Sequence, residues 1–141
     1  MLNRFRAIVR MAAVSLAVSG CSSLTDPQLL TDFEWGEVEN PATVQERILT
    51  SVVLGELYVL GQMQTPTRCY NIGFDLGRNG SQLTLRVSAK LGNSTNCDQN
   101  LGAYRYTLTV HNLKFGTYNL RVFHDITGAQ GGEFTETVTV R

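Results

Sequence analysis

The 141-residue chain has no excess of charge of either sign, with 12 basic and 12 acidic residues. Arg4, Arg6 and Arg10 lie in the first ten positions, so the chain after residue 20 keeps 9 basic and 12 acidic residues, a net charge of −3 (9 − 12). Nucleic-acid-binding proteins usually carry a basic face. Attachment to anionic lipid headgroups uses clusters of lysine and arginine. The balance therefore argues against nucleic acid as a partner and against polybasic membrane attachment.

The sequence also lacks a long hydrophobic run and the common catalytic motifs. Its longest apolar stretch has about ten residues, whereas a membrane-spanning helix needs roughly 20. We find no G-x-S-x-G, H-E-x-x-H, P-loop or Rossmann glycine pattern. We therefore expect no catalytic residue, no cofactor and no enzyme activity. The hydrophobic content of 43% nevertheless disfavours disorder of the whole chain, and the length predicts one domain.

A targeting segment occupies the start of the chain. Charged residues are followed by a short apolar stretch and then by small residues, which is the pattern of an export signal. The ending Leu-Ala-Val-Ser-Gly-Cys, residues 16–21, resembles the lipobox of bacterial lipoproteins. That resemblance implies removal of residues 1–20 and attachment of lipid, including palmitate, to Cys21. Ser22 stands where Asp would imply inner-membrane retention, so the resemblance implies the outer membrane. The alternative is an ordinary signal peptide with Cys21 unmodified.

Two cysteines remain if Cys21 carries lipid. An even number of cysteines in an exported chain indicates a disulfide, here between Cys69 and Cys97. The closed loop of about 29 residues would stabilise the fold by roughly 3.5 kcal/mol. Two free thiols are the alternative. A metal site is disfavoured because no CxxC or Cys/His cluster accompanies the pair.

Residues 21–47 are expected to be the lipidated cysteine and a tether, because prolines and an acidic run disfavour a packed core there. Phe33 and Trp35 would either dock on the domain or contact a partner. A short helix over residues 43–49 is a further expectation, with Thr43 as its cap and Glu46 three residues on.

From residue 48 onward, apolar and polar residues alternate with a period of two, as in half-buried strands. The alternation is interrupted by turn signals such as Asn79-Gly80, which suits a tight hairpin. We predict an all-β domain over 48–141, an antiparallel sandwich of about six to seven strands. Its longest polar loops are residues 91–102 and 125–132.

One segment within this domain, residues 113–122, resembles the tyrosine corner of fibronectin type III and other immunoglobulin-like modules. Leu113, Gly116 and Tyr118 match, whereas Phe115 stands where proline is common. The resemblance implies an immunoglobulin-like architecture, with the Tyr118 hydroxyl bonded to upstream backbone. It implies no functional residue, because such folds host many functions.

Few residues suggest chemistry. His111 and His124 end successive strands and should lie on the order of 20 Å apart, which is too far for them to share a metal. We therefore expect each histidine to be exposed to solvent at the end of its strand. His124 with Asp125 could bind a cation or a sugar, although turn formation by Asp125 is the simpler interpretation. The other acidic candidates, expected to point outward, are Asp75, Glu133 and Glu136. The 91–102 loop offers calcium a weak set of oxygens from Asn93, Asn96, Asp98 and Asn100.

These features together favour a noncatalytic, lipid-anchored protein of the cell envelope that presents an immunoglobulin-like module. Its expected partners are the membrane, through the lipid on Cys21, and an envelope protein or a glycan. The alternative is a protease inhibitor or binder that acts through the 91–102 loop.

Overall fold

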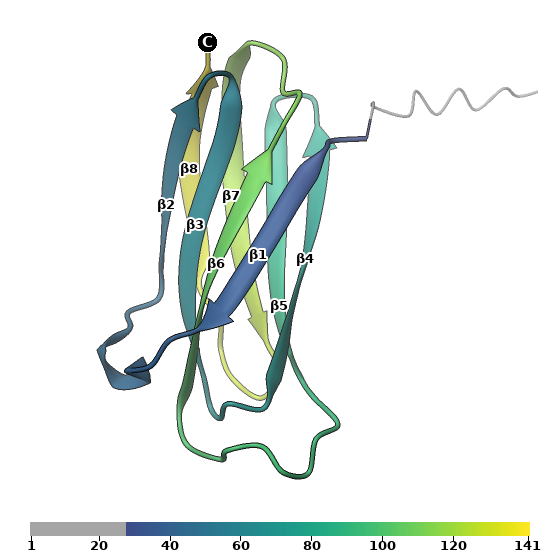
Figure 1. Cartoon of the computed structure of the whole chain (residues 1–141). Helices are drawn as coiled ribbons and strands as arrows, with labels where there is room; N and C mark the ends of the chain where they lie inside the picture. Colours follow the sequence, from purple (N-terminus) through teal and green to yellow (C-terminus); the bar gives the residue numbers. More distant parts are fainter. Residues whose placement is uncertain (1–27) are drawn as a thin grey trace, which may run out of the picture.

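Two four-stranded β-sheets pack face to face in the part of the chain that the computed structural model describes, residues 28–141 (Figure 1). Cys21 and the expected signal segment, residues 1–20, lie outside the described residues. The first sheet has the order β1-β6-β3-β2 and the second β4-β5-β7-β8. The strands are β1 Thr31–Glu37, β2 Arg47–Val53, β3 Glu56–Thr65, β4 Tyr70–Asn79, β5 Gln82–Leu91, β6 Gly102–Val110, β7 Gly116–Ile126 and β8 Glu133–Val140.

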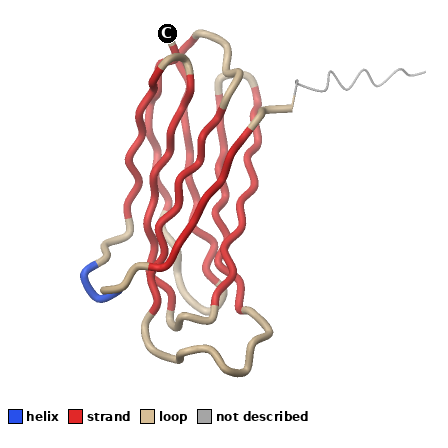
Figure 2. Tube along the Cα trace, in the orientation of Figure 1, coloured by secondary structure: helices blue, strands red, loops and turns tan. Residues whose placement is uncertain are grey.

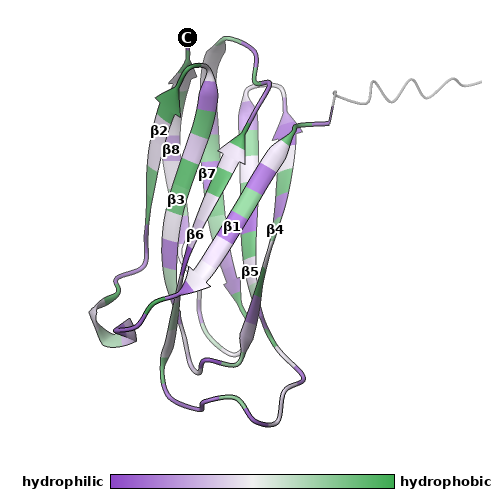
Figure 3. Cartoon of the chain, viewed as in Figure 1, coloured by the Kyte–Doolittle hydropathy of each residue, from purple (hydrophilic) through white to green (hydrophobic). Residues whose placement is uncertain are grey.

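The predicted all-β sandwich is confirmed, with eight strands instead of six or seven. A short 3-10 helix, η1 Pro41–Thr43, is the one helical element among the described residues (Figure 2). Side chains alternate along each strand, and hydrophobic and hydrophilic bands therefore follow one another along the arrows (Figure 3). In β5, for example, Leu83, Leu85 and Val87 are fully buried between the sheets.

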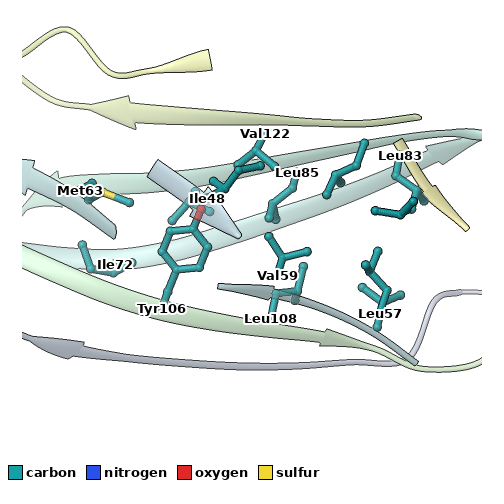
Figure 4. Packing of buried hydrophobic residues seen from close by; sticks show 14 of the residues in the cluster. Ile48, Leu57, Val59, Met63, Ile72, Leu83, Leu85, Tyr106, Leu108 and Val122 are labelled. Atoms are coloured by element: carbon teal, nitrogen blue, oxygen red, sulfur yellow. The ribbon is translucent and has the colours of Figure 1, made fainter. Parts of the chain in front are cut away.

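The core is one cluster that draws on both sheets (Figure 4). Its largest fully buried side chains include Tyr104, Leu57 and Met63. Every residue of this cluster, and every apolar residue packed against it, lies between Leu29 and Val140. The described segment therefore carries a hydrophobic core of its own.

One strand pair departs from the antiparallel arrangement that we expected. β5 and β7 are parallel neighbours, with Leu83 opposite Leu120 and Ala89 opposite Ile126. After β5 the chain crosses to the other sheet, forms β6 there, and returns to lay β7 beside β5 in the same direction. Two crossings between sheets therefore replace the hairpin that an antiparallel pair would use.

The domain begins earlier than the expected boundary at residue 48. β1, placed in the tether by its acidic residues, is an edge strand paired with β6, with Phe33 opposite Leu108. Phe33 stacks on Phe74 at 4.5 Å between ring centroids, and Trp35 meets Tyr104 edge-on at 5.7 Å. Both aromatic residues thus dock on the domain. The helix expected over residues 43–49 was wrong, because β2 begins at Arg47 and pairs with β3.

The backbone hydrogen bond that the tyrosine corner implies is present. The Tyr118 hydroxyl donates to the carbonyl oxygen of Lys114 at 2.8 Å, and Leu113 is buried beside this turn. Gly116 opens β7 with a φ of +155°. These contacts fix the crossing from β6 to β7.

The predicted disulfide between Cys69 and Cys97 is also present. It joins the start of β4 to the loop between β5 and β6, and the Arg68 backbone N–H donates to the Asp98 carbonyl oxygen beside it. Among the described residues, no helix has the length and apolar character needed to cross a membrane.

Candidate functional site

A histidine lies in the interior of the sandwich, where sequence reasoning expected a solvated strand end. His124 of β7 is 3% exposed. Its Nδ1 lies 2.5 Å from Oε1 of Glu46, which precedes β2. Its Nε2 lies 2.8 Å from the hydroxyl of Tyr106 in β6. The expectation failed because His124 follows Leu120 and Val122 at the inward register of β7, so alternation alone turns it toward the core.

The partners of this imidazole define its protonation. Burial lowers the pKa of His124, and this outweighs the opposing effect of Glu46 and Asp125, so the ring is neutral near pH 7. A carboxylate can only accept, so Nδ1 carries the proton and donates to Glu46. Nε2 then accepts from the Tyr106 hydroxyl, whose pKa burial raises well above its usual value. Both ring nitrogens are thus occupied inside the protein.

Glu46 also holds the loop between β7 and β8. The backbone N–H of Gly132 donates to Glu46 Oε1 at 2.8 Å. A Cβ on Gly131 would lie 1.6 Å from the carbonyl oxygen of His124, and one on Gly132 would lie 2.8 Å from the Phe134 ring. These two glycines therefore allow the loop to fold tightly against β7.

The opposite face of the same segment of β7 bears a depression of about 720 Å³. Residues 125–132 form one wall, and outward side chains of β5 and β7 form its floor, among them Arg86, Ser88 and Phe123. Gly73 lies opposite Ser88 in the β4–β5 pair, so that position contributes no side chain to the floor. The buried network beneath fixes the shape of the wall from inside the sandwich.

Charged groups flank one aromatic ring in this depression. Arg86 and Arg121 place their guanidinium carbons 4.7 and 5.0 Å from the centroid of the Phe123 ring. Arg86 pairs with Asp125 at 3.1 Å, and Arg121 pairs with Glu133. Such a surface offers both signs of charge, hydrogen-bond donors and a ring edge, which suits a polar ligand or a protein loop. None of these side chains is needed for the core.

His111 forms a separate cluster at the end of the sandwich where β1 begins. Its Nε2 lies 2.8 Å from Oδ2 of Asp32, and its Nδ1 lies 2.6 Å from Oε1 of Glu56. Hydrogen bonds to these carboxylates raise the pKa of His111, and the bonds from Tyr58 and His111 lower that of Glu56. Through these two hydrogen bonds, His111 links β1, β3 and the β6–β7 loop.

The structure separates most of the residues that the sequence singled out. His111 precedes β7 and His124 lies near its far end, each with different partners. His124 and Asp125 point to opposite faces of their sheet. Asp125 lies within β7 instead of in a turn, and it pairs with Arg86 of β5. Asp75 and Glu133 line the depression. The described residues hold no group of three or more His, Cys, Asp or Glu side chains placed to hold a metal.

The 91–102 loop uses its one carboxylate for its own structure. Asp98 Oδ1 accepts from the backbone N–H of Asn100 at 2.9 Å, and Oδ2 lies 3.8 Å from Nε of Arg68. Tyr106, Arg86 and Phe123 were not singled out from the sequence, and Glu46 was considered only as part of a helix cap. The outward register of Arg86 and Phe123 on predicted strands was the one available signal.

Comparison of the chain with models of protein families, with curated proteins and with solved structures found no match.

Proposed function

We propose that this chain is a noncatalytic, lipid-anchored protein of the cell envelope, attached through Cys21 and presenting its β-sandwich as a binding module. The lipobox-like ending at residues 16–21 supports the anchor. The depression over Arg86, Ser88 and Phe123 supports a binding role, and it is the observation that carries the proposal.

Three features of the depression favour recognition over chemistry. Its charged side chains are already paired with one another, as Arg86 is with Asp125. The histidine beneath it is enclosed, with both nitrogens engaged. Ser88 lies on the outer face of the sheet, away from that histidine. A polar envelope protein or a glycan would bind by exchanging these surface pairs for contacts of its own.

The anchor is tested by Cys21→Ser. We expect this variant to leave the membrane fraction while its domain keeps the same thermal unfolding midpoint. Mass spectrometry of the wild-type N-terminal peptide should show an acylated Cys21. Membrane retention of a folded Cys21→Ser variant would overturn the anchor.

The binding role is tested by capture from an envelope extract on the immobilised, oxidised fragment 22–141. Wild type is compared with Ser88→Trp, which fills the depression, and with Thr137→Trp, which lies on the outer face of the same sheet outside it. A saturable protein or glycan that binds wild type and Thr137→Trp but not Ser88→Trp supports the proposal. Equal retention by all three, or retention by none, contradicts it.

A second candidate function is protease inhibition by the 91–102 loop. The observation in its favour is the disulfide at Cys97, which fixes the loop to β4 as inhibitory loops require. Stoichiometric inhibition of a protease panel that is lost in Cys69→Ser/Cys97→Ser would favour it over the first candidate.

A further inference from the structure

One end of the sandwich carries the most exposed apolar side chains of the described chain. Leu54, in the β2–β3 turn, is 98% exposed, Phe115 is 81% exposed and Leu30 is 61% exposed. No other large apolar side chain among residues 28–141 reaches these fractions. We call Leu30, Leu54 and Phe115 the apolar tip.

Hydrogen bonds show that these residues share one end. The backbone N–H of His111 donates to the Leu30 carbonyl oxygen at 2.8 Å. The ring of the same histidine contacts Glu56, which is two residues after Leu54. Phe115 ends the loop that His111 opens. Figure 1 shows the β2–β3 turn, this loop and the start of β1 at the same end.

Packing within the domain does not explain why a leucine occupies position 54 in the β2–β3 turn. Leu54 has a φ of +52°. This left-handed conformation costs a branched residue about 1–2 kcal/mol and suits Gly or Asn. At 98% exposure the Leu54 side chain gains almost nothing from packing within the described domain. An external apolar contact would compensate both the strain and the exposure.

We propose that the apolar tip rests on the surface of the lipid bilayer to which the chain is anchored. This inference rests on the proposed anchor at Cys21. Six residues lie between Cys21 and Gln28, where the described chain begins, and the seven steps from one to the other can span at most about 25 Å. Strands of ten residues are about 33 Å long, which is more than this linker can span. Because β1 begins at the apolar tip, the anchor holds this end of the sandwich nearest the membrane.

The charges beside the tip suit phosphate headgroups. Lys114 is the exposed neighbour of Phe115. Arg141 follows Val140, whose partner across the β7–β8 pair is Gly116. The nearby carboxylates of Asp32 and Glu56 are both engaged by His111. Two cations therefore flank Phe115, and each contributes about 1 kcal/mol next to an anionic surface.

Three apolar side chains are too few to hold a protein on a membrane without a tether. When the chain is already anchored by its lipid, binding of the apolar tip to the bilayer becomes an intramolecular event. A low affinity of the tip for the bilayer is then sufficient. The wall of the depression, residues 125–132, lies at the other end of β7 from Phe115. Docking of the tip would therefore leave the proposed binding face directed away from the bilayer.

The test uses fragment 22–141, which contains the whole described core, with an N-terminal histidine tag bound to nickel-chelating lipid. The vesicles contain phosphatidylglycerol and lipids brominated on the acyl chain. Phe115→Trp is compared with Leu101→Trp, which is 40% exposed in the loop at the opposite end, and both variants keep Trp35. We expect at least about twofold stronger quenching for Phe115→Trp, because a docked ring reaches the acyl boundary.

Equal quenching of the two variants would overturn the proposal. If Phe115→Trp does not fold, Leu54→Trp takes its place against the same control. Adding Leu54→Ser to Phe115→Trp should reduce the quenching, whereas adding Leu91→Ser, at the end of β5 away from the tip, should not. In this experiment the histidine tag takes the place of the acyl chain. Equal quenching therefore refutes only the docking of the apolar tip and does not bear on the anchor at Cys21. Absence of acyl from Cys21 of the native protein refutes the anchor alone.

Discussion

The hydroxyl of Tyr106 lies 2.8 Å from Nε2 of His124, although the two residues belong to different sheets. Together with Glu46, this pair forms a polar link between the two sheets. The same carboxylate binds Gly132, so the link extends to the loop that walls the depression.

Tyr106→Phe should remove the hydroxyl and keep the ring, which stacks near Phe33 at 5.7 Å between centroids. Nε2 of His124 would lose its donor in a buried position, which costs about 1–3 kcal/mol of unfolding free energy. Urea unfolding followed by circular dichroism measures the loss. An unchanged midpoint would mean that water or a shift of the ring replaces the hydroxyl.

Gly61→Ala should be strongly destabilising. A Cβ at this position would lie 2.0 Å from Cζ of Tyr106, because the tyrosine ring crosses the backbone of β3 there. Removing this overlap requires the buried Tyr106 side chain to move. We therefore expect the free energy of unfolding to fall by about 3 kcal/mol, at the upper end of overpacking costs. Gly36→Ala in β1 is the matched control, since no atom lies within 4 Å of its added Cβ. Similar thermal midpoints for the two variants would contradict the packing described.

The two histidines of the chain should titrate on opposite sides of the ordinary value of 6.5. The pKa of His111 is raised by its carboxylate partners, and that of His124 is lowered by burial. Stability from His111 is therefore complete below pH 6.5 and is lost as pH rises through its folded pKa. Stability from His124 is complete above pH 6.5 and declines as pH falls toward its folded pKa, because the unfolded chain takes up the proton.

Nuclear magnetic resonance of the imidazole Cε1 protons measures both pKa values, with His111→Gln to assign the signals. A pKa of His124 above that of His111 would contradict the buried, neutral imidazole.

Loss of the disulfide should cost about 3.5 kcal/mol by the loop-entropy relation, for a sequence separation of 28. Cys69→Ser/Cys97→Ser is compared with the oxidised wild type by urea unfolding. We also expect faster proteolysis within residues 92–101, because Cys97 no longer holds that loop to β4. Equal stability would mean that the backbone bond between Arg68 and Asp98 already closes the loop.

Much of the fold could be predicted because its signals are local. Alternation located the strands from residue 70 onward, and the pair of cysteines predicted the disulfide. β1 was missed because its acidic residues resemble a tether. Its own alternation, in which Phe33 and Trp35 alternate with Asp32 and Glu34, was the usable signal.

The site could not be predicted in the same way. Glu46 is 78 residues from His124, and no local pattern pairs them. The parallel pairing of β5 with β7 could not be predicted from the sequence either. Turn residues indicate which successive strands form hairpins, but they do not indicate where the chain crosses from one sheet to the other.

The parallel pairing of β5 and β7 also constrains how the chain can fold. The chain between these two partners contains β6, which lies in the opposite sheet, so their pairing closes a long loop. All four strands of the β1-β6-β3-β2 sheet precede β7 in the sequence, whereas the β4-β5-β7-β8 sheet is completed only by β7 and β8. Most contacts join residues distant in sequence. Domains dominated by such non-local contacts generally fold slowly. A nascent chain would therefore leave one edge of β5 unpaired until β7 emerges, and an unpaired edge is open to pairing with another chain.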